Sequence, residues 1–371
     1  MKNDLYGNDQ RIIMTLDAGG TNFVFSAIKG NSEIVTPIRK AAHASDLDRC
    51  METAFRGFEE VRGMLPGPAA AISFAFPGPA DYRNGIIGDL PNFPAFTGGV
   101  PLGPMLEDHF GIPVFINNDG NLFAYGEAIA GYLPWLNGKM REGGGDKQFR
   151  NLVGFTLGTG FGSGIVLGET MVLGHSTGGA EIHNTLNPFN PEWNAEEGVS
   201  TRAIQRVYAS AAGTPFSDKL MPGDIYDIAT GSREGNLEAA LESFQAFGRS
   251  LGGSIANTLS LFDGIVVLGG GITAAWDLFS PAMFGEINRP YQDLRGNNIA
   301  RLSYPVYNLE DQKALDEFCS LRGRELEVPG SGRRVAYDAE PRTGVGLSRL
   351  GASRAIGLGA YAFALQQLDA V

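Results

Sequence analysis

Short apolar runs and amphipathic stretches alternate along this chain in the way expected of an α/β protein. Each apolar run of the first part ends at glycine, proline or a polar cluster, and one long stretch has apolar residues at helical spacing. The expected elements are strands over 11–17 and 22–28, a third over 33–41, a helix over 46–65, and a buried strand from 69 that stops at Pro77.

The next stretch predicts a helix, a short buried strand and a second helix. The first helix ends at Gly111, and the strand in "IPVFINND" ends in Asn117, Asn118 and Asp119, where a helix over 120–132 begins. The carboxyl edge of such a strand is where α/β proteins bind ligands. Residues 134–151 are polar and glycine-rich, which predicts a mobile loop or a connection between lobes.

The pattern of the first two strands returns later in the chain. "VGFTLGTGFGSGIVLGE" (153–169) parallels "IMTLDAGGTNFVFSAIKG" (13–30), because each has an apolar strand ending in Thr-Leu, a turn of Gly and Thr, and another apolar strand. We interpret this as a duplication, so that two lobes share a core topology. Helices are expected from 197 and over 237–262 and 351–368, the last returning to the first lobe, and 300–345 is expected to be an irregular surface segment.

The size of the chain supports two lobes. At 371 residues it is too long for one ordinary core. We expect a smaller N-terminal lobe of residues 1–125 plus 355–371 and a larger lobe of residues 126–354, facing each other across a cleft. The 52 glycines exceed the usual share and predict a ligand site that depends on close approach to the backbone.

Charge and cysteine content exclude several classes of protein. A formal net charge of −12 disfavours binding to nucleic acid, whose phosphates are met by clustered Lys and Arg. The two cysteines, Cys50 and Cys319, form no CxxC pair, which argues against a disulfide framework and a cysteine-rich zinc site. The chain shows no export signal and no apolar stretch long enough to span a membrane. We expect a cytoplasmic protein.

Three glycine turns follow three apolar strands, and their members are Gly19, Gly20 and Thr21; Gly158, Thr159 and Gly160; and Gly269, Gly270 and Gly271. Glycine lets phosphate oxygens reach backbone N–H groups, and a Thr hydroxyl adds a donor. Any one such turn is also typical of a hairpin or a helix cap. Neither a P-loop nor a dinucleotide GxGxxG pattern fits, because "GTGFGSG" continues as a strand.

Two aspartates stand at strand ends, where phosphoryl transfer to an alcohol needs carboxylates. One must orient and deprotonate the hydroxyl, and one must stand near the Mg²⁺ that shields the phosphates. We assign Asp119 to the first role and Asp17 to the second. The alternative for Asp119 is an N-cap of the following helix.

The segment "GHSTGGAEIHNTLNPFN" gathers His175, Glu181, His183 and Asn184. Glu181 and Asn184 have the carboxylate and amide groups that bind sugar hydroxyls. A metal site is the rival interpretation, but two histidines without cysteines support a structural zinc poorly. A solvated polar loop is the other alternative.

Taken in order, these motifs resemble the ROK family of sugar kinases and regulators, within the hexokinase and actin-like ATPase superfamily. "DAGGTN" and "GTGFGSGIVLG" are similar to its two phosphate motifs, "FPGPAD" to its PGxVD-like turn, "PNFPAFTGGVPLGPMLEDHFGIPVFINND" to its sugar-binding and catalytic segment, and "IVVLGGGI" to its adenosine motif. The resemblance covers nearly the whole chain. It implies an α/β fold of two ribonuclease-H-like lobes.

The resemblance also implies roles for single residues. Asp119 is implied as the catalytic base, and the three glycine turns as contacts of ATP. The implied sugar ligands are Asn92, Asn118, Glu181, Asn184 and, by its spacing to a following Ser, Glu196.

The chain departs from the family pattern after Glu181. Relatives have E-x-G-H and then a CxCGxxGC zinc cluster, whereas this chain has His183 in place of the Gly, Asn184 in place of the zinc-binding His, and no cysteine in the loop that follows. We therefore expect no structural zinc and a loop held by packing of Phe189 and Trp193. The role of His183 stays open.

Sequence alone therefore predicts an ATP- and Mg²⁺-dependent kinase that phosphorylates a hexose hydroxyl. Glucose or a close relative is the first candidate substrate, and N-acetylated hexosamines, mannose and fructose stay open. ROK repressors carry a helix-turn-helix domain ahead of the first phosphate motif, which here begins at Asp17, so a kinase is favoured over a DNA-binding regulator. A non-catalytic sugar sensor is the alternative, and an ATPase or chaperone-like member of the superfamily is a third. The family resemblance implies a homodimer.

Overall fold

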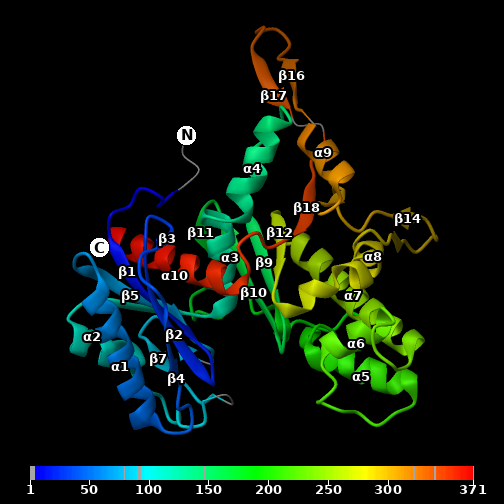
Figure 1. Cartoon of the computed structure of the whole chain (residues 1–371). Helices are drawn as coiled ribbons and strands as arrows, with labels where there is room; N and C mark the ends of the chain where they lie inside the picture. The colour runs from blue at the N-terminus through cyan, green and yellow to red at the C-terminus, as the bar shows by residue number, and fades with distance from the viewer. Residues whose placement is uncertain are drawn as a thin grey trace. The chain divides into compact units, whose positions relative to one another are not determined.

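The computed structural model describes residues 5–78, 80–90, 93–145, 147–320, 322–337 and 340–370. By their contacts these residues group into two units (Figure 1). Unit 1 is Met1–Pro134, Gly164–Ala180 and Arg349–Val371, and unit 2 is Trp135–Ser163 and Glu181–Ser348. Gly164–Ala180 thus belongs to unit 1, although the sequence places it in the larger lobe. The lobe boundaries at 125/126 and 354/355 stay a prediction.

Unit 1 is built on a mixed sheet with the strand order β3-β2-β1-β5-β8 and with β4 paired to β2. Its elements are β1 (Ile12–Ala18), β2 (Asn22–Lys29), β3 (Ser32–Glu33), β4 (Ile38–Ala41), α1 (Leu47–Met64), β5 (Ala69–Ala75), β6 (Ala80–Asp81), β7 (Ile86–Ile87), α2 (Leu102–Phe110), β8 (Val114–Asn117), α3 (Asp119–Ile129), β11 (Thr170–Met171) and α10 (Ala352–Asp369).

Side chains of β1 alternate between two apolar cores, as the pleat requires. Met14 and Leu16 belong to a core that includes Phe58 of α1, while Ile13 packs with Leu358 and other residues of α10 on the opposite face. Helix α1 begins and ends where its pattern predicts: the Asp46 side chain accepts the Arg49 N–H at 3.1 Å as N-cap, and Leu65 is the C-cap. Unit 1 is therefore a three-layer α/β structure.

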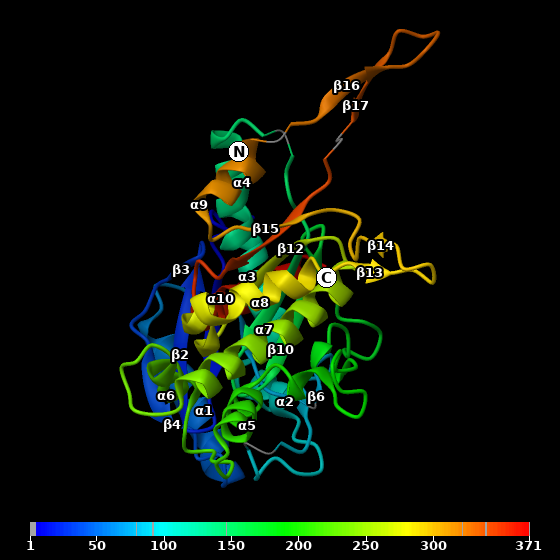
Figure 2. The same ribbon diagram turned by 90° about the vertical axis from the view of Figure 1, so that its right-hand side faces the viewer.

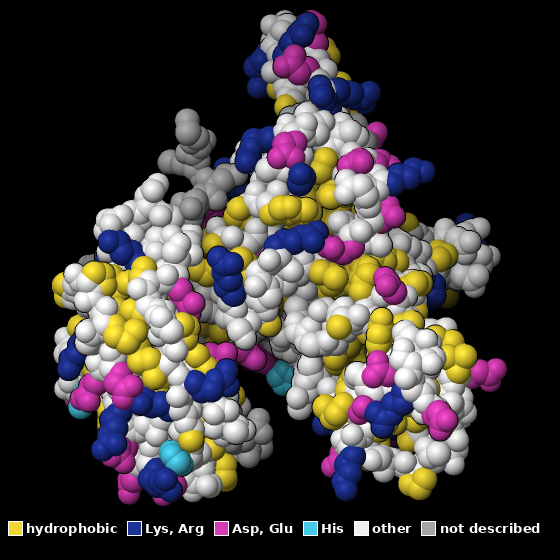
Figure 3. All heavy atoms as spheres, viewed as in Figure 1, with side chains coloured by type: hydrophobic (Ala, Val, Ile, Leu, Met, Phe, Trp, Pro, Cys, Tyr) yellow, Lys and Arg dark blue, Asp and Glu magenta, His cyan; other side chains and the backbone are white. Residues whose placement is uncertain are grey.

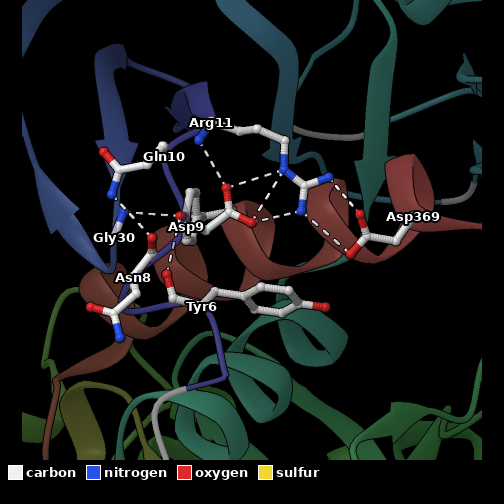
Figure 4. A network of polar contacts seen from close by, with 8 residues as sticks. Tyr6, Asn8, Asp9, Gln10, Arg11, Gly30 and Asp369 are labelled. Atoms are coloured by element: carbon white, nitrogen blue, oxygen red, sulfur yellow. Dashed lines mark hydrogen bonds and ion pairs between the residues drawn. The ribbon is translucent and has the colours of Figure 1, made fainter.

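Polar contacts fasten helix α10 to the N-terminal segment, so its predicted return to the first lobe is confirmed (Figure 4). Arg11 donates to Asp9 at 2.6 Å and to Asp369 near the end of α10 at 2.5 Å. The Tyr361 hydroxyl accepts the N–H of Gly30 at 2.9 Å. Segments far apart in the sequence thus form one edge of unit 1.

Unit 2 is built around the second sheet, whose strand order is β11-β10-β9-β12-β18-β15. Helix α4 (Tyr132–Glu142) enters unit 2 at Trp135, and β10 (Phe161–Leu167) leaves it after Ser163. The other elements are β9 (Leu152–Leu157), η1 (Ile182–Asn184), η2 (Ala195–Glu197), α5 (Thr201–Ala212), α6 (Pro222–Ala229), α7 (Leu237–Leu259), β12 (Ile265–Gly269), η3 (Gly271–Ala275), α8 (Trp276–Ile287), β13 (Tyr291–Gln292), β14 (Asn298–Ile299), β15 (Val306–Asn308), α9 (Gln312–Ser320), β16 (Arg324–Glu327), β17 (Arg334–Tyr337) and β18 (Thr343–Leu347).

The two sheets repeat one topology. The order β3-β2-β1-β5-β8 matches β11-β10-β9-β12-β18 strand for strand. In both sheets the later strands run parallel to the first: β5 to β1 and β8 to β5, then β12 to β9 and β18 to β12. The shared core topology predicted from the repeated pattern is confirmed, and so is the α/β fold class.

Two segments that the sequence analysis treated as irregular contain regular structure. Residues 134–151 were expected to form a loop, but α4 covers the first part, because Leu133, Leu136 and Met140 recur at helical spacing and are buried. Pro134 is tolerated in its first turn. Within 300–345, β18 is a buried strand next to β12, and α9 buries Leu315 and Phe318. The loop expected over 134–151 was wrong for the residues of α4, whereas its alternative, a connection between lobes, agrees with the unit boundary between Pro134 and Trp135. The irregular structure expected over 300–345 was wrong for α9 and β18.

The strands β16 and β17 form a hairpin that extends away from α9 and β18 within unit 2 (Figure 2). Positive and negative side chains are interspersed over it, as the space-filling view shows (Figure 3). Leu326 and Tyr337 in this hairpin are exposed. This part of 300–345 is the surface segment that the sequence analysis expected.

Candidate functional site

The predicted site residues of unit 1 lie at the carboxyl edge of its sheet. Asp17 on β1 is in register with Ala75 on β5, and Ala75 is in register with Asn117 on β8. Neighbouring strands are ~4.8 Å apart, so Asp17 and Asn117 are about 10 Å apart across the row. Asp17 is exposed, and Asn117 is 2% exposed. The sheet therefore places Asp17 at the same edge as Asn117, which lies two residues before Asp119.

Asp119 is the first residue of α3 and is exposed. The N-cap of α3 is Asn118, whose Oδ1 accepts the Asn121 N–H at 2.7 Å, so the interpretation of Asp119 as the N-cap is wrong. Asp119 Oδ1 accepts the N–H of Gly120 at 2.9 Å. Asn117 Oδ1 accepts the Asn118 N–H at 2.9 Å and an amide N–H of Asn121 at 3.1 Å. These bonds fix the backbone that carries Asp119.

The first glycine turn joins β1 to β2. Gly19 donates its N–H to the Asn22 carbonyl at 3.0 Å, which closes the turn, and the Thr21 carbonyl accepts the Ala42 N–H at 3.0 Å. Gly19, Gly20 and Thr21 are exposed. Only Ala18 separates the turn from Asp17, so the predicted metal ligand and the first predicted phosphate contact are two residues apart.

The other two glycine turns lie side by side in unit 2. Strand β9 runs parallel to β12 with Thr156 opposite Gly269, so both strands end at the same edge. Gly270 has φ 98°, and a Cβ there would lie 2.8 Å from the Leu157 backbone nitrogen. Only glycine fits this position. At Gly158 and Gly271 a Cβ would have no atom within 4 Å, so a ligand can approach the backbone there.

Glu196 lies against the second glycine turn. Its Oε2 accepts the N–H of Phe161 at 3.1 Å and would be 2.7 Å from a Cβ on Gly160. The other end of the turn is held by Thr201 at the start of α5, which donates both its N–H (2.9 Å) and its hydroxyl (3.1 Å) to the Gly158 carbonyl. A predicted sugar ligand thus touches a predicted phosphate turn.

Arg202 links Glu196 to its neighbour. The Arg202 guanidinium lies 3.5 Å from Glu196 and 2.5 Å from Glu197, and Arg206 lies 2.6 Å from Glu197. These guanidinium groups, Arg202 first, lower the pKa of the Glu197 carboxyl. Thr201 and Arg202 were not among the residues predicted for the site. The signal was the helix start after "EEGVS", where Ser200 is the N-cap and the next two residues face the preceding turn.

Glu181, His183 and Asn184 lie together in and just before η1. His183 Nδ1 is 3.0 Å from Glu181 Oε2, and the Asn184 N–H donates to the Glu181 carbonyl at 3.2 Å. The hydrogen bond with Glu181 raises the pKa of His183, and the charge of Glu196 contributes in the same direction. The structure therefore brings Glu181 and Glu196 to one place in unit 2.

The loop after η1 is held by asparagines. Asn187 is 4% exposed, and its Oδ1 accepts the N–H groups of Phe189 (2.9 Å) and Asn190 (3.1 Å), while its amide donates to Asn194 at 3.3 Å. Phe189 is 52% exposed, so the expectation that it packs the loop in place is wrong. Trp193 in the same loop makes a cation–π contact, in which the Arg206 guanidinium lies 4.2 Å from the centre of its ring.

Some expectations fall outside what the structure tests. Asn92 lies outside the described residues. Among the described ranges, no three His, Cys, Asp or Glu side chains are grouped so that they could hold a metal ion. In that same part of the chain, no helix has the length and apolar character needed to cross a membrane.

Comparison with known proteins gives one family. A family model described as the ROK family matches residues 13–308. A glucokinase from Thermotoga maritima is 27% identical over 287 residues, which are 72% of this chain and 85% of the relative. An N-acetyl-D-glucosamine kinase from Vibrio cholerae is 28% identical over 268 residues, 69% of this chain and 83% of the relative.

A solved structure extends the comparison to the whole fold. The crystal structure of a glucokinase from Parabacteroides distasonis superimposes with a TM-score of 0.87 and 48% sequence identity, over 98% of this chain and 99% of that one. The resemblance read from the phosphate, sugar and adenosine motifs is confirmed. Because the family model spans well over half of its residues, this chain belongs to the ROK family.

Proposed function

We propose that this chain is an ATP-dependent sugar kinase that transfers the γ-phosphoryl group of ATP to a hexose hydroxyl. Membership of the ROK family and the likeness to glucokinases and an N-acetylglucosamine kinase support this activity. One observation in the structure carries the proposal furthest: in two sheets of equal topology, predicted site residues lie at or just after the ends of central strands. These are Asp17, Asn118 and Asp119 in one sheet and Gly158 and Gly269 in the other.

Asp119 is the proposed general base. A carboxylate of this kind accepts the proton of the sugar hydroxyl while the hydroxyl oxygen bonds to the γ-phosphorus, and the bond from phosphorus to the bridging oxygen breaks to release ADP. The exposure of Asp119 and the fixed backbone of Asn117 and Asn118 support this role, because the carboxylate is accessible and held at a defined place.

Sugar hydroxyls are the proposed partners of Asn92, Asn118, Glu181, Asn184 and Glu196. Glu181 and Glu196 both act on His183, so they lie near each other in unit 2, which supports sugar binding by these two residues. A carboxylate accepts hydrogen bonds from hydroxyls but has no donor for a phosphate. We therefore assign the Gly160 end of the 158–160 turn, where Glu196 lies, to the sugar. Glucose or a close relative is the first candidate, and N-acetylated hexosamines are the second.

ATP phosphates are the proposed partners of the turns at 19–21 and 158–160, and adenosine that of the turn at 269–271. Open space at Gly158 and Gly271 fits close approach of a nucleotide to the backbone. Asp17 offers an exposed carboxylate close to the 19–21 turn, which suits Mg²⁺, an ion that keeps several waters and would shield the phosphates when bound.

The remaining expectations are proposals of the same kind. We propose that the protein is a cytoplasmic homodimer that binds no nucleic acid, in line with its net charge of −12 and two buried free cysteines. We also propose that it needs no structural zinc, since Asn187 holds the loop that a zinc cluster holds in relatives. Light scattering of the purified protein tests the homodimer, and metal analysis tests the absence of zinc.

The decisive experiment is a coupled ADP-release assay with Mg-ATP against a panel of hexoses and N-acetylhexosamines. Asp119→Ala should lower kcat about 10²- to 10⁴-fold, as expected for loss of a general base. The fold should survive, because the cap between Asn118 and Asn121 does not involve the Asp119 side chain.

The matched control is Asp48→Ala, which removes an exposed carboxylate from the first turn of another helix of unit 1. It should leave kcat unchanged. Sugar-dependent turnover that persists in Asp119→Ala would remove Asp119 from the mechanism. Sugar binding by calorimetry without any turnover in the wild type would replace the kinase with the sugar sensor.

A further inference from the structure

His183 occupies a fixed position beside one proposed sugar ligand. It is the central residue of η1, whose first residue, Ile182, is 9% exposed and donates its N–H to Ser163 Oγ at 3.4 Å. The Ile182 carbonyl accepts the hydroxyl of Thr185 at 2.7 Å. The turn is thus anchored through Ile182, while the side chains of Glu181 and His183 on either side are 35% and 34% exposed.

Acidic side chains lie around His183. Glu181 bonds to His183 at 3.0 Å, and Glu196 on η2 acts on it through its charge. Glu197 on η2 is paired with Arg202 and Arg206, and Arg202 reaches Glu196 only at 3.5 Å. Protonated His183 therefore gives Glu181 a cationic partner at hydrogen-bonding distance.

Since a carboxylate that binds a sugar must present its oxygens at a defined angle, the partner that holds it decides how well it binds. We propose that His183 is a positioning residue that orients Glu181 for the sugar, so that sugar affinity, and not ATP affinity, depends on the protonation of His183. This inference rests on the proposed function. It gives a role to the residue at which this chain departs from the E-x-G-H pattern of its family.

The direction of the pH dependence follows from the pair. Protonated His183 is a cation that donates from Nδ1 to Glu181, and it offsets the repulsion between Glu181 and Glu196. Neutral His183 can still donate from Nδ1, but the ion pair is lost and the site gains one negative charge. The pKa of His183 lies above its ordinary value because of Glu181. Sugar KM should therefore rise as the pH increases through that raised pKa.

The experiment compares three variants of the full-length protein from about pH 5.5 to 9. His183→Ala removes the donor, and it should raise sugar KM about 5- to 20-fold with kcat and ATP KM changed less than about 3-fold. His183→Gln keeps an N–H donor without titrating. It should abolish the pH dependence of sugar KM and hold KM near the wild-type value reached above the pKa of His183, below the KM of His183→Ala. His175→Ala, at an exposed histidine, is the control and should match the wild type.

A second readout needs no turnover. The chain has four histidines, so the His183 ring signal is assigned by its loss in His183→Ala and then followed by NMR titration. Glu181→Gln should lower the titration midpoint of His183, and saturating glucose should shift it in the wild type. Unchanged values in both cases would overturn the inference.

The outcomes separate this inference from the proposed function. Wild-type turnover with sugar KM and its pH profile unchanged in His183→Ala would overturn the role of His183 alone. If the wild type binds sugar but does not turn it over, the kinase proposal fails, and sugar Kd by calorimetry in the same variants decides the role of His183. If it neither binds nor phosphorylates any sugar of the panel, both fail.

Discussion

The packing of α10 against α3 gives a sharp prediction about the helix that carries Asp119. Gly359 on α10 is buried, and a Cβ there would lie 2.7 Å from the Leu122 carbonyl carbon and 3.0 Å from its Cα, with the carbonyl oxygen closer still. Gly126 on α3 lies against the Ala355 backbone in the same way, because a Cβ added at Gly126 would lie 2.7 Å from the Ala355 carbonyl carbon. Glycines on both helices thus permit backbone contact.

Gly359→Ala should therefore destabilise unit 1. Ordinary contact begins at 3.4 Å, so the helices would have to separate by about 0.7 Å to clear the Leu122 carbonyl carbon and by more to clear its oxygen. Backbone atoms cannot rotate away as a side chain can. Overpacking of this severity should lower the free energy of unfolding by about 3 kcal/mol. The gain in helix propensity from Gly to Ala offsets about 1 kcal/mol. The net expectation is a loss of about 2 kcal/mol.

Gly357→Ala is a control on the same helix. A Cβ at Gly357 would lie 3.7 Å from Ile28 Cδ1, which is ordinary contact, so the same substitution should stabilise the protein by up to about 1 kcal/mol. Urea unfolding followed by circular dichroism should separate the two variants by about 3 kcal/mol. Sugar phosphorylation should also slow in Gly359→Ala, since α3 begins with Asp119. Gly359→Ala unfolding at the same urea concentration as Gly357→Ala would refute the argument.

Two further predictions concern single contacts. Gly160→Ala places a Cβ 2.7 Å from Glu196 Oε2, so the hydrogen bond from the Phe161 N–H to Glu196 should break. Steady-state kinetics should then give a sugar KM about 10-fold higher. An unchanged sugar KM would argue against a role of this contact in sugar binding. Asp9→Asn should lower stability at pH 7 by about 1 kcal/mol. Hydrogen bonding to Arg11 lowers the pKa of Asp9, so the stability that Asp9 contributes is present above its unfolded pKa and is lost as the pH falls through its folded pKa. In urea unfolding, the stability difference between Asp9→Asn and the wild type should therefore disappear in acid. A stability difference that persists in acid would contradict this role of Asp9.

Local pattern identified the elements that carry the candidate site. The helix over 46–65, the strand ending in Asn117 to Asp119, and the three glycine turns were all readable from short windows. The reason is that apolar periodicity, caps and glycine turns depend on neighbouring residues only. The repeat of one strand pattern likewise predicted the shared topology of two sheets.

The same local rules failed where burial decided the structure. Strand β18 reads Thr-Gly-Val-Gly-Leu, too short and too rich in glycine to stand out, and it is a strand because β12 and β15 flank it. Helix α4 was hidden by the polar residues that follow it, although Leu136 and Met140 are fully buried. Partners distant in the chain supply the free energy for both elements.

What the sequence by itself determined is the inventory: two α/β halves of one topology, carboxylates at Asp17 and Asp119, and the acidic residues Glu181 and Glu196. Tertiary structure alone decided which of these meet: the register that aligns Asp17 with Asn117, the seat of Glu196 on the 158–160 turn, and the bond from His183 to Glu181. The first set follows from local propensity, whereas the second depends on strand pairing and close packing, which no window of neighbouring residues contains.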